Sequence, residues 1–221
     1  DPDGQFEYLA PGVSASDSFQ YTIFDGQDQT DTATVHVTIQ GINDSPQALD
    51  NVALTTEDQS IEIDVLADDT DVDQADVLSI VSLDTSLTKG TVSISPSDTI
   101  IYDPQGHYDA LTSGESDVDT FYYTVSDGHG GTDTALVSVT VMGVNDSPIA
   151  IAQTLEIGEH DSSVTSRLQA SDVDTDDDAD SLIYQWLTFP SRGEFLDLGD
   201  GHFSFDPSGQ FSDVPLGQFA E

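Results

Sequence analysis

The sequence predicts an all-β protein built from tandem antiparallel β-sandwiches, with about seven strands in each complete module. Three observations lead to this prediction. A stretch of the chain recurs almost unchanged, because TDTATVHVTIQGINDSP at 30–46 returns as TDTALVSVTVMGVNDSP at 132–148. Short segments alternate apolar with polar residues, and clusters of turn-forming residues separate these segments. No segment shows the period of 3.6 residues that is typical of an amphipathic helix.

The repeat defines a module of roughly one hundred residues. Asn43 and Asn145 occupy equivalent positions 102 residues apart. A second marker, Asp-Pro-x-Gly-x-(Phe/Tyr), begins at Asp1, Asp103 and Asp206. Repetition at this length indicates modules that each have their own core. We therefore divide the chain into the last two strands of one module (1–46), a complete module (47–148) and the beginning of a third (149–221).

Seven strands are predicted in the complete module, near 52–56, 60–65, 78–83, 90–95, 99–102, 119–126 and 134–142. Because side chains alternate across a strand, one set of apolar residues in the last two strands faces the core: Phe121, Tyr123, Val125, Val137, Val139 and Val141. The first segment repeats this pattern at Phe19, Tyr21, Ile23, Val35, Val37 and Ile39. This strand count suits a two-sheet sandwich of the immunoglobulin-like type, and an up-and-down barrel is the alternative.

Composition narrows the possible partners. The chain has 43 Asp and Glu residues against 3 Lys and Arg, a formal net charge of −40, which excludes nucleic acid and anionic lipid as partners. No apolar run approaches the roughly 18 residues of a membrane span, so no membrane insertion is expected. Without cysteine, metal binding would rely on oxygen ligands and hard cations. Adaptation to high salt is an alternative explanation for the overall charge.

Acidic residues are crowded into two equivalent runs. The runs are DDTDVDQAD, with Asp69, Asp71, Asp73 and Asp76, and SDVDTDDDAD, with Asp172, Asp174, Asp176, Asp177, Asp178 and Asp180. Crowded carboxylates repel one another unless a cation neutralises them, and acids at alternate positions can surround Ca²⁺ with oxygen. Neither run is an EF-hand, because Ile80 and Ile183 stand at the twelfth position. Solvated acidic turns are the alternative.

Two further kinds of acidic position recur at module ends. One is the linker pair, Asn43 with Asp44 and Asn145 with Asp146, for which a plain turn before proline is the alternative. The other comprises Glu57 with Asp58 after the first strand and Glu115 with Asp117 before the sixth. The Asp-Gly pairs at Asp25 and Asp127 are interpreted as hairpin turns and not as ligands.

Together these positions resemble the cadherin and bacterial cadherin-like repeats, as found in VCBS-type repeats of large RTX-type surface adhesins exported by type I secretion. The resemblance covers nearly the whole chain and implies cadherin-like sandwiches with Ca²⁺ between successive modules. At the second linker it implies a complete set of ligands: Asn145, Asp146, Asp172, Asp174, Glu57 and Glu115. At the first linker it implies Asn43, Asp44, Asp71 and Asp73. Val13 and Ala15 replace the upstream acids there, which predicts weaker calcium binding.

The expected function is that of a calcium-stiffened stalk in a long adhesin, secreted or held at the bacterial cell surface. Its partners would be neighbouring modules, and cell-surface or glycan ligands are left open. The incomplete terminal modules also suggest head-to-tail self-association. No enzyme is expected, because the acids repeat in every module whereas an active site needs one unique constellation. The alternative is a carbohydrate-binding or spacer module attached to a secreted polysaccharide-degrading enzyme.

Overall fold

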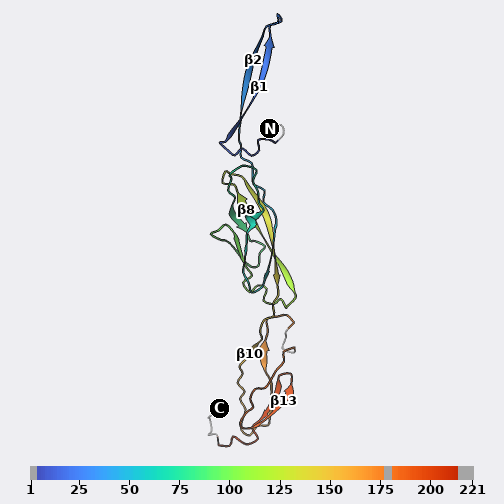
Figure 1. Ribbon diagram of the computed structural model, residues 1–221. Coiled ribbons are helices and arrows are strands. Elements are labelled where there is room, and N and C mark those ends of the chain that lie inside the picture. Colours follow the sequence, from blue (N-terminus) through green and yellow to red (C-terminus); the bar gives the residue numbers. More distant parts are fainter. Residues whose placement is uncertain (1–3, 177–180, 214–221) are drawn as a thin grey trace. The chain divides into compact units, whose positions relative to one another are not determined.

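The computed structural model describes residues 4–176 and 181–213, which form β-strands and one short 3₁₀ helix (Figure 1). This confirms the all-β prediction. The described chain divides into two compact units. Unit 1 comprises residues 1–108 and 116–142, and unit 2 comprises residues 109–115 and 143–221.

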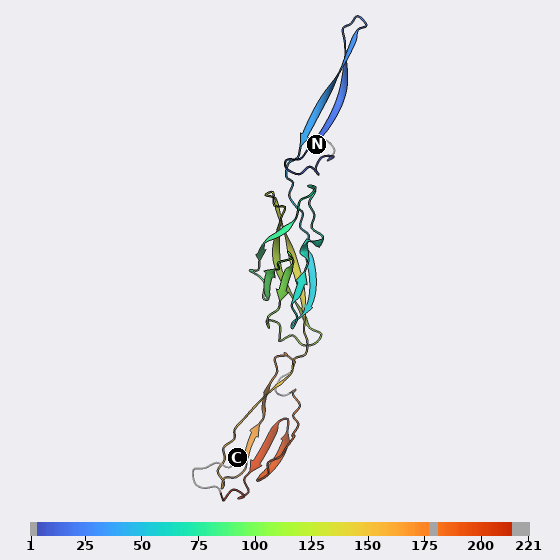
Figure 2. The ribbon, with the colours of Figure 1, turned by 60° about the vertical axis from the view of Figure 1, so that its left-hand side comes forward.

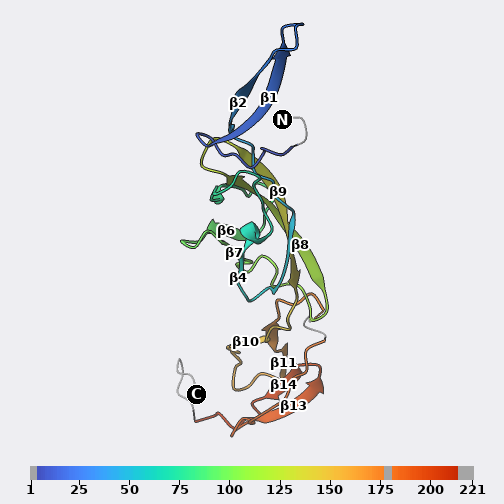
Figure 3. The ribbon, with the colours of Figure 1, turned by 45° about the horizontal axis from the view of Figure 1, so that its top comes forward.

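Unit 1 contains a sandwich of two sheets, in which all neighbouring strands are antiparallel except β3 and β9. The four-stranded sheet has the order β3-β9-β8-β5, and the three-stranded sheet has the order β4-β7-β6 (Figure 3). The seven strands are β3 (Asn51–Thr56), β4 (Ile61–Ile63), β5 (Ser79–Asp84), β6 (Thr91–Ile94), β7 (Ile100–Asp103), β8 (Ser116–Ser126) and β9 (Thr132–Met142). The helix η1 (Val65–Ala67) follows β4. All seven predicted strands are therefore present, and β3 alone pairs in parallel, with β9.

The core of the sandwich lies on the predicted face of β8 and β9. The side chains of Phe121, Tyr123, Val125, Val137, Val139 and Val141 are all buried, which confirms the alternation read from the sequence. Ile100 and Tyr102 of β7 supply the opposite layer, and the rings of Tyr102 and Phe121 stack with centroids 6.4 Å apart. Apolar burial of this kind is the main stabilising term of the fold.

Two buried aspartates anchor tyrosines of this core. Asp119 accepts hydrogen bonds from the Tyr102 hydroxyl and from the backbone N–H groups of Lys89, Gly90 and Thr120. Burial raises the pKa of Asp119, but these hydrogen bonds outweigh burial and hold the pKa below its ordinary value. Asp69, which the sequence places in the first acidic run, accepts from the Tyr123 hydroxyl at 2.8 Å.

The hairpin of β1 (Ser14–Phe24) and β2 (Thr30–Gln40) forms a separate two-stranded sheet (Figure 2). Its register, Ser14 opposite Gln40 through Phe24 opposite Thr30, is that of β8 and β9 displaced by 102 residues. Its apolar face is not buried, however. Phe19 is 57% exposed, whereas its counterpart Phe121 is 1% exposed.

Unit 2 has a three-stranded sheet of order β11-β14-β13 and a short pair, β10 with β12. The strands are β10 (Ile149–Ile151), β11 (Val164–Arg167), β12 (Gln169–Ser171), β13 (Glu194–Gly199) and β14 (His202–Asp206). Phe195 and Phe203 of this sheet contact the Trp186 ring edge-on, with centroids 4.6 and 5.6 Å away. Trp186 therefore belongs to the aromatic cluster of unit 2.

Candidate metal sites

The first candidate site lies in unit 1, where three loops meet. Asp71 and Asp76 belong to the loop before β5, and Asp127 follows β8 directly. Carboxylate oxygens of these three residues lie within 4.8 Å of one another. Asp76 also contacts His129, whose ring nitrogen Nδ1 lies 3.2 Å from Asp76 Oδ2. Three carboxylates at such short range repel one another strongly unless a cation lies between them.

The linker joins this group through Asp73. The Asp44 N–H donates to Asp73 Oδ2 at 2.8 Å, and the Asp73 N–H donates to Asp71 Oδ1 at 2.9 Å. Each aspartate thus uses one oxygen to fix the loop. The second oxygens, Asp71 Oδ2 and Asp73 Oδ1, are buried and have no hydrogen-bond partner among the described residues. Asp73 is only 3% exposed, so this orphaned oxygen is also withdrawn from water.

Asn43 contacts the same group of residues through Asp127. Its amide nitrogen donates to the Asp44 carbonyl at 2.7 Å and to Asp127 Oδ2 at 2.8 Å. These two bonds fix the orientation of the amide. The Asn43 side-chain oxygen is buried, and within the described part of the chain it has no partner. Buried polar atoms are normally satisfied, so these three oxygens are candidate ligands for a cation.

Asp127 has two roles, of which the sequence showed only one. Its carboxylate accepts from the backbone N–H groups of His129, Gly130 and Gly131, which forms the predicted turn. It also belongs to the acidic group, which the hairpin interpretation missed. Burial raises its pKa, but the bonds from Asn43 and the backbone outweigh burial and lower it, so Asp127 is held as a carboxylate.

Gly131 is needed for this arrangement. A Cβ at position 131 would lie 2.2 Å from Asp127 Oδ2 and 3.1 Å from Asn43 Nδ2.

In the sequence, Asp127 is marked only by its Asp-Gly pair, which recurs at Asp25. Asp25 itself, in the exposed hairpin turn, accepts only from Gln27 and Gln29 in the bonds that the structure shows.

The electrostatics of this group of aspartates suit a cation ligand. The pKa of Asp71 is raised, first by burial and then by repulsion from Asp76, Asp73 and Asp127. A raised pKa means that the charged form of Asp71 is less favourable here than in water. A divalent cation would remove this penalty. Carboxylate and amide oxygens are the ligands of hard cations such as Ca²⁺, which takes 6–8 oxygens.

The second candidate site lies in unit 2 and repeats the same frame. The Asp146 N–H donates to Asp174 Oδ2 at 2.8 Å, and the Asp174 N–H donates to Asp172 Oδ1 at 3.2 Å. The remaining oxygens, Asp172 Oδ2 and Asp174 Oδ1, are buried without a partner in the ranges that the structure describes. Asp174 is 4% exposed. The orphaned atoms are therefore equivalent to those of Asp71 and Asp73.

Asn145 differs in detail from Asn43. Its amide donates to the Asp146 carbonyl, as Asn43 does to Asp44, but Asn145 is exposed. The counterparts of Asp76 would be sought at Asp177, Asp178 and Asp180, which lie outside the described residues. Asp176 is described and exposed.

The upstream acids lie in different settings. Glu57 is buried directly after β3, and its N–H donates to the Met142 carbonyl. Glu115 is exposed, and its side chain accepts from the Thr112 N–H at 3.2 Å. Asp117 pairs with Lys89 at 2.6 Å, and the hydrogen bond from Lys89 lowers the pKa of Asp117. Asp117 is thus neutralised by Lys89. The assignment of Glu57 and Glu115 as ligands stays a prediction.

A glycine fixes the start of each linker. A Cβ at Gly41 would lie 2.1 Å from the Leu9 carbonyl oxygen, and a Cβ at Gly143 would lie 2.3 Å from that of Thr112. The Gly41 N–H donates to the Val13 backbone carbonyl, and the Gly143 N–H donates to the Glu115 backbone carbonyl. Only glycine permits this close approach of two backbone segments. Each linker therefore begins from the same backbone frame.

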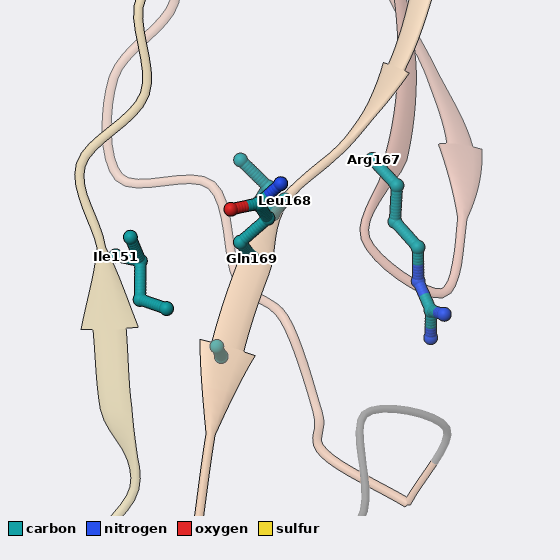
Figure 4. A pocket seen from close by; sticks show the side chains of 5 residues that line it. Ile151, Arg167, Leu168 and Gln169 are labelled. Carbon is teal, nitrogen blue, oxygen red and sulfur yellow. The ribbon is translucent and has the colours of Figure 1, made fainter.

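Another concave feature does not resemble a binding site. A shallow pocket in unit 2 is lined by Ile151, Arg167, Leu168, Gln169 and Ala170 (Figure 4). The picture shows Ile151 on the neighbouring segment and the Arg167 guanidinium extending away from it. The lining lacks the convergent polar groups that orient a small ligand.

Comparison with known proteins identifies the family. A model described as "Bacterial Ig domain" matches residues 1–38, 43–140 and 145–218. Because these matches cover most of the sequence, the chain belongs to the bacterial Ig domain family. A search of curated proteins found no match. The part of the chain that the structure describes contains no helix with the length and apolar character needed to cross a bilayer.

Several solved structures are also similar. Human CDH23 EC21-23 is 15% identical, with 87% of this chain and 64% of that chain covered and a TM-score of 0.47. Protocadherin Gamma C5 EC1-3 is 17% identical, with 86% and 66% covered and a TM-score of 0.43. An endo-fucoidan hydrolase of glycoside hydrolase family 107 is 16% identical, with 90% and 30% covered and a TM-score of 0.32. The chain spans less than two thirds of the length of each of these three structures.

Proposed function

We propose that the chain is a calcium-binding repeat segment of a secreted or surface-anchored bacterial adhesin, in which Ca²⁺ at the module linkers stiffens a stalk. One observation carries the proposal. At each linker two equivalent aspartates fix the loop with one carboxylate oxygen each. Their other oxygens are buried and have no hydrogen-bond partner among the described residues. The two pairs are Asp71 with Asp73 and Asp172 with Asp174. Membership of the bacterial Ig domain family supports the modular part of the proposal.

Solvated acidic turns explain this geometry less well than ion binding does. An acidic turn without an ion would direct its carboxylates into water, because water is their best partner in the absence of a cation. Asp73 and Asp174 are nevertheless almost completely buried. Desolvating a carboxylate without a counter-charge is costly, and the repulsion around Asp71 adds to that cost.

Calcium is the cation that best fits the ligands. The unit 1 group offers the orphaned oxygens of Asn43, Asp71 and Asp73 together with the carboxylates of Asp76 and Asp127. Ca²⁺ accepts many oxygen ligands in irregular geometry, whereas Mg²⁺ demands a near-ideal octahedron and keeps several waters. The described residues of unit 2 offer Asp172 and Asp174, with Asp146 beside them.

Ion binding would order the linkers by joining elements that are distant in sequence. In unit 1 the group connects the linker at Asn43 and Asp44 with the loop before β5 and with the turn after β8. An ion that binds only the folded state adds about 2.7 kcal/mol per site at a hundredfold excess over Kd. Extracellular Ca²⁺ concentrations suit sites of Kd on the order of 10⁻⁴–10⁻³ M. The acids act as ligands here, so no enzymatic activity is proposed.

The test is isothermal titration of Ca²⁺ into the chelator-treated chain and three variants. Asp73→Asn should abolish binding at the first site alone, and Asp174→Asn should abolish binding at the second alone. The control, Asp28→Asn, removes one exposed carboxylate from the hairpin turn and should bind as the parent does. Equal loss in all three variants would reduce the effect to overall charge, and no binding by the parent would defeat the proposal.

A further inference from the structure

Asp69 differs from the other aspartates of the first acidic run, because both of its carboxylate oxygens have partners. Oδ1 accepts from the Leu49 N–H at 2.8 Å, and the Tyr123 hydroxyl lies 2.8 Å from Oδ1 and 2.9 Å from Oδ2. Among the residues that the structure describes, the acidic group of unit 1 does not include Asp69. The burial of Asp69 is therefore explained by its contact with a core tyrosine and not by an ion.

The Tyr123 hydroxyl is the part of the core that reaches the acidic loop. Tyr123 lies in β8 and is fully buried. Its hydroxyl has one proton to donate, and Asp69 Oδ1 is closer to it than the carbonyl oxygens of Leu49 and Val65, at 3.0 and 3.4 Å. A hydrogen bond to a carboxylate is also stronger than one to a neutral carbonyl. The proton therefore goes to Asp69, which joins a core strand to the start of the loop.

The segment after the first linker is paired with the acidic loop at three points. The middle point consists of two backbone hydrogen bonds of 2.7 and 3.1 Å, and at the outer points a backbone N–H donates to a carboxylate. The three pairs are Gln47 with Thr70, Asp44 with Asp73 and Leu49 with Asp69. Asp69 is the member of this set that is tied to the core, and the candidate ligands Asp71 and Asp73 follow two and four residues later.

β8 thus fixes the acidic loop at two places. Tyr123 contacts Asp69 at the start of the loop. Asp127, which follows β8 directly, belongs to the acidic group with Asp71 and Asp76 further along the loop. Attachment at both places restricts where the carboxylates can lie before an ion binds. Ligands that are already ordered lose less conformational entropy on binding than ligands that the ion must order.

We propose that Asp69 and Tyr123 are positioning residues of the first candidate site. The Tyr123 hydroxyl, through Asp69, holds Asp71 and Asp73 where both can contact a cation, and neither positioning residue touches the ion. This inference rests on the proposed calcium binding. Loss of an outer partner of a metal site typically lowers metal affinity by about 10–100-fold.

The second candidate site provides an internal reference. Ala170 lies two residues before Asp172, as Asp69 lies two residues before Asp71. The backbone hydrogen bonds to Asp172 and Asp174 form there nevertheless. The anchor is therefore not needed to form the frame of hydrogen bonds. Its loss at the first site should weaken Ca²⁺ binding without abolishing it.

The experiment titrates Ca²⁺ calorimetrically into chains that carry Asp174→Asn, so that the first site alone is expected to bind. Tyr123→Phe removes one hydroxyl and keeps the ring, and Asp69→Ala removes its acceptor. Each should raise the Kd of the first site about tenfold. Titrations are made at a temperature at which circular dichroism shows every variant to be folded. In a background of Asp73→Asn, the same two substitutions should leave the Kd of the second site unchanged.

The matched control is Tyr102→Phe. Tyr102 is also fully buried, and its hydroxyl donates to an aspartate at the same distance, 2.8 Å to Asp119. Asp119 lies near the start of β8, whereas Asp127 follows its end. Tyr102→Phe should therefore lower the stability of the module and leave the Kd of the first site unchanged.

Amide exchange measured by NMR in chelator provides a readout that needs no calcium. The Asp73 N–H, which donates to Asp71, should exchange faster in Tyr123→Phe than in the parent chain. In Tyr102→Phe the faster exchange should instead be at the Gly90 N–H, which donates to Asp119. This pattern would show that the tyrosine hydroxyl orders the loop before an ion is bound.

The outcomes that contradict the inference are distinct. Equal weakening by Tyr123→Phe and Tyr102→Phe would reduce the effect to module stability. Binding that is abolished by Asp69→Ala but unaffected by Tyr123→Phe would make Asp69 a ligand. Unchanged binding in both Asp69→Ala and Tyr123→Phe would overturn the positioning role and leave the proposed function standing. A parent chain that binds no Ca²⁺ would overturn the proposed function and this inference together.

Discussion

The β8–β9 and β1–β2 hairpins have similar sequences and the same register of paired residues, but their surroundings differ. In β8–β9 the apolar face is the centre of the module core, and in β1–β2 the same face is exposed. Strand formation and pairing are thus local properties of the repeat. Burial of the apolar face depends on five other strands.

Buried polar groups show the same contrast. Asp119 accepts hydrogen bonds from four donors, which are three backbone N–H groups and the Tyr102 hydroxyl. Its counterpart Asp17 is exposed and accepts from the N–H of Ser18. The aspartate is therefore an anchor only where the strands that carry its donors are beside it.

The largest expected difference in stability is between Phe121, which is buried, and its exposed counterpart Phe19. Phe121→Ala should lower the free energy of unfolding of the complete module by about 3–5 kcal/mol, because it leaves a cavity against Tyr102. Phe19→Ala should change the free energy of unfolding by less than about 0.5 kcal/mol in dilute monomeric chain. Hydrogen exchange read by mass spectrometry in increasing urea resolves the modules. Equal costs would show that the hairpin is already packed.

The next effect concerns the two aspartates. Asp119→Asn should lower the free energy of unfolding of the complete module by about 1–3 kcal/mol. The reason is that the new side-chain NH₂ group is buried and faces the donors that Asp119 accepts from. Asp17→Asn should cost nothing measurable. Acid unfolding in chelator provides a second readout. The folded-state pKa of Asp119 is lowered, so its contribution is present above the ordinary pKa of 3.8 and is lost as pH falls through the lower value. The Asp119→Asn chain should lack this acid-dependent loss.

The smallest effect concerns the outer faces, which are solvated in both hairpins. The Thr124 and Thr134 hydroxyls lie 3.1 Å apart, and those of Thr22 and Thr32 lie 2.9 Å apart. Thr124→Ala and Thr22→Ala should therefore cost similar amounts, about 0.2–1 kcal/mol of pairing free energy each. Amide exchange of each hairpin measures this cost. A large difference would mean that the outer faces also have unequal surroundings.

Most of the fold could be predicted because its signals are local. The seven strands and the inward side of β8 and β9 follow from alternation alone. The candidate sites were predicted less completely. Asp71, Asp73 and their counterparts were found from their spacing, but Asp127 was interpreted as a turn residue. Its hydrogen bonds to the turn are local, whereas its proximity to Asp71 depends on how β8 meets a loop more than fifty residues earlier.

By itself the sequence determined the repeat, the strands, their alternation and the acidic loops, because each depends on residues that are near one another in the chain. The tertiary structure decided which equivalent residues are buried and which aspartate oxygens have no partner. It also decided that Asp69 accepts a hydrogen bond from the Tyr123 hydroxyl. The reason is that burial and hydrogen bonding depend on strands brought together from distant parts of the chain, and equivalent segments can differ in which strands lie beside them.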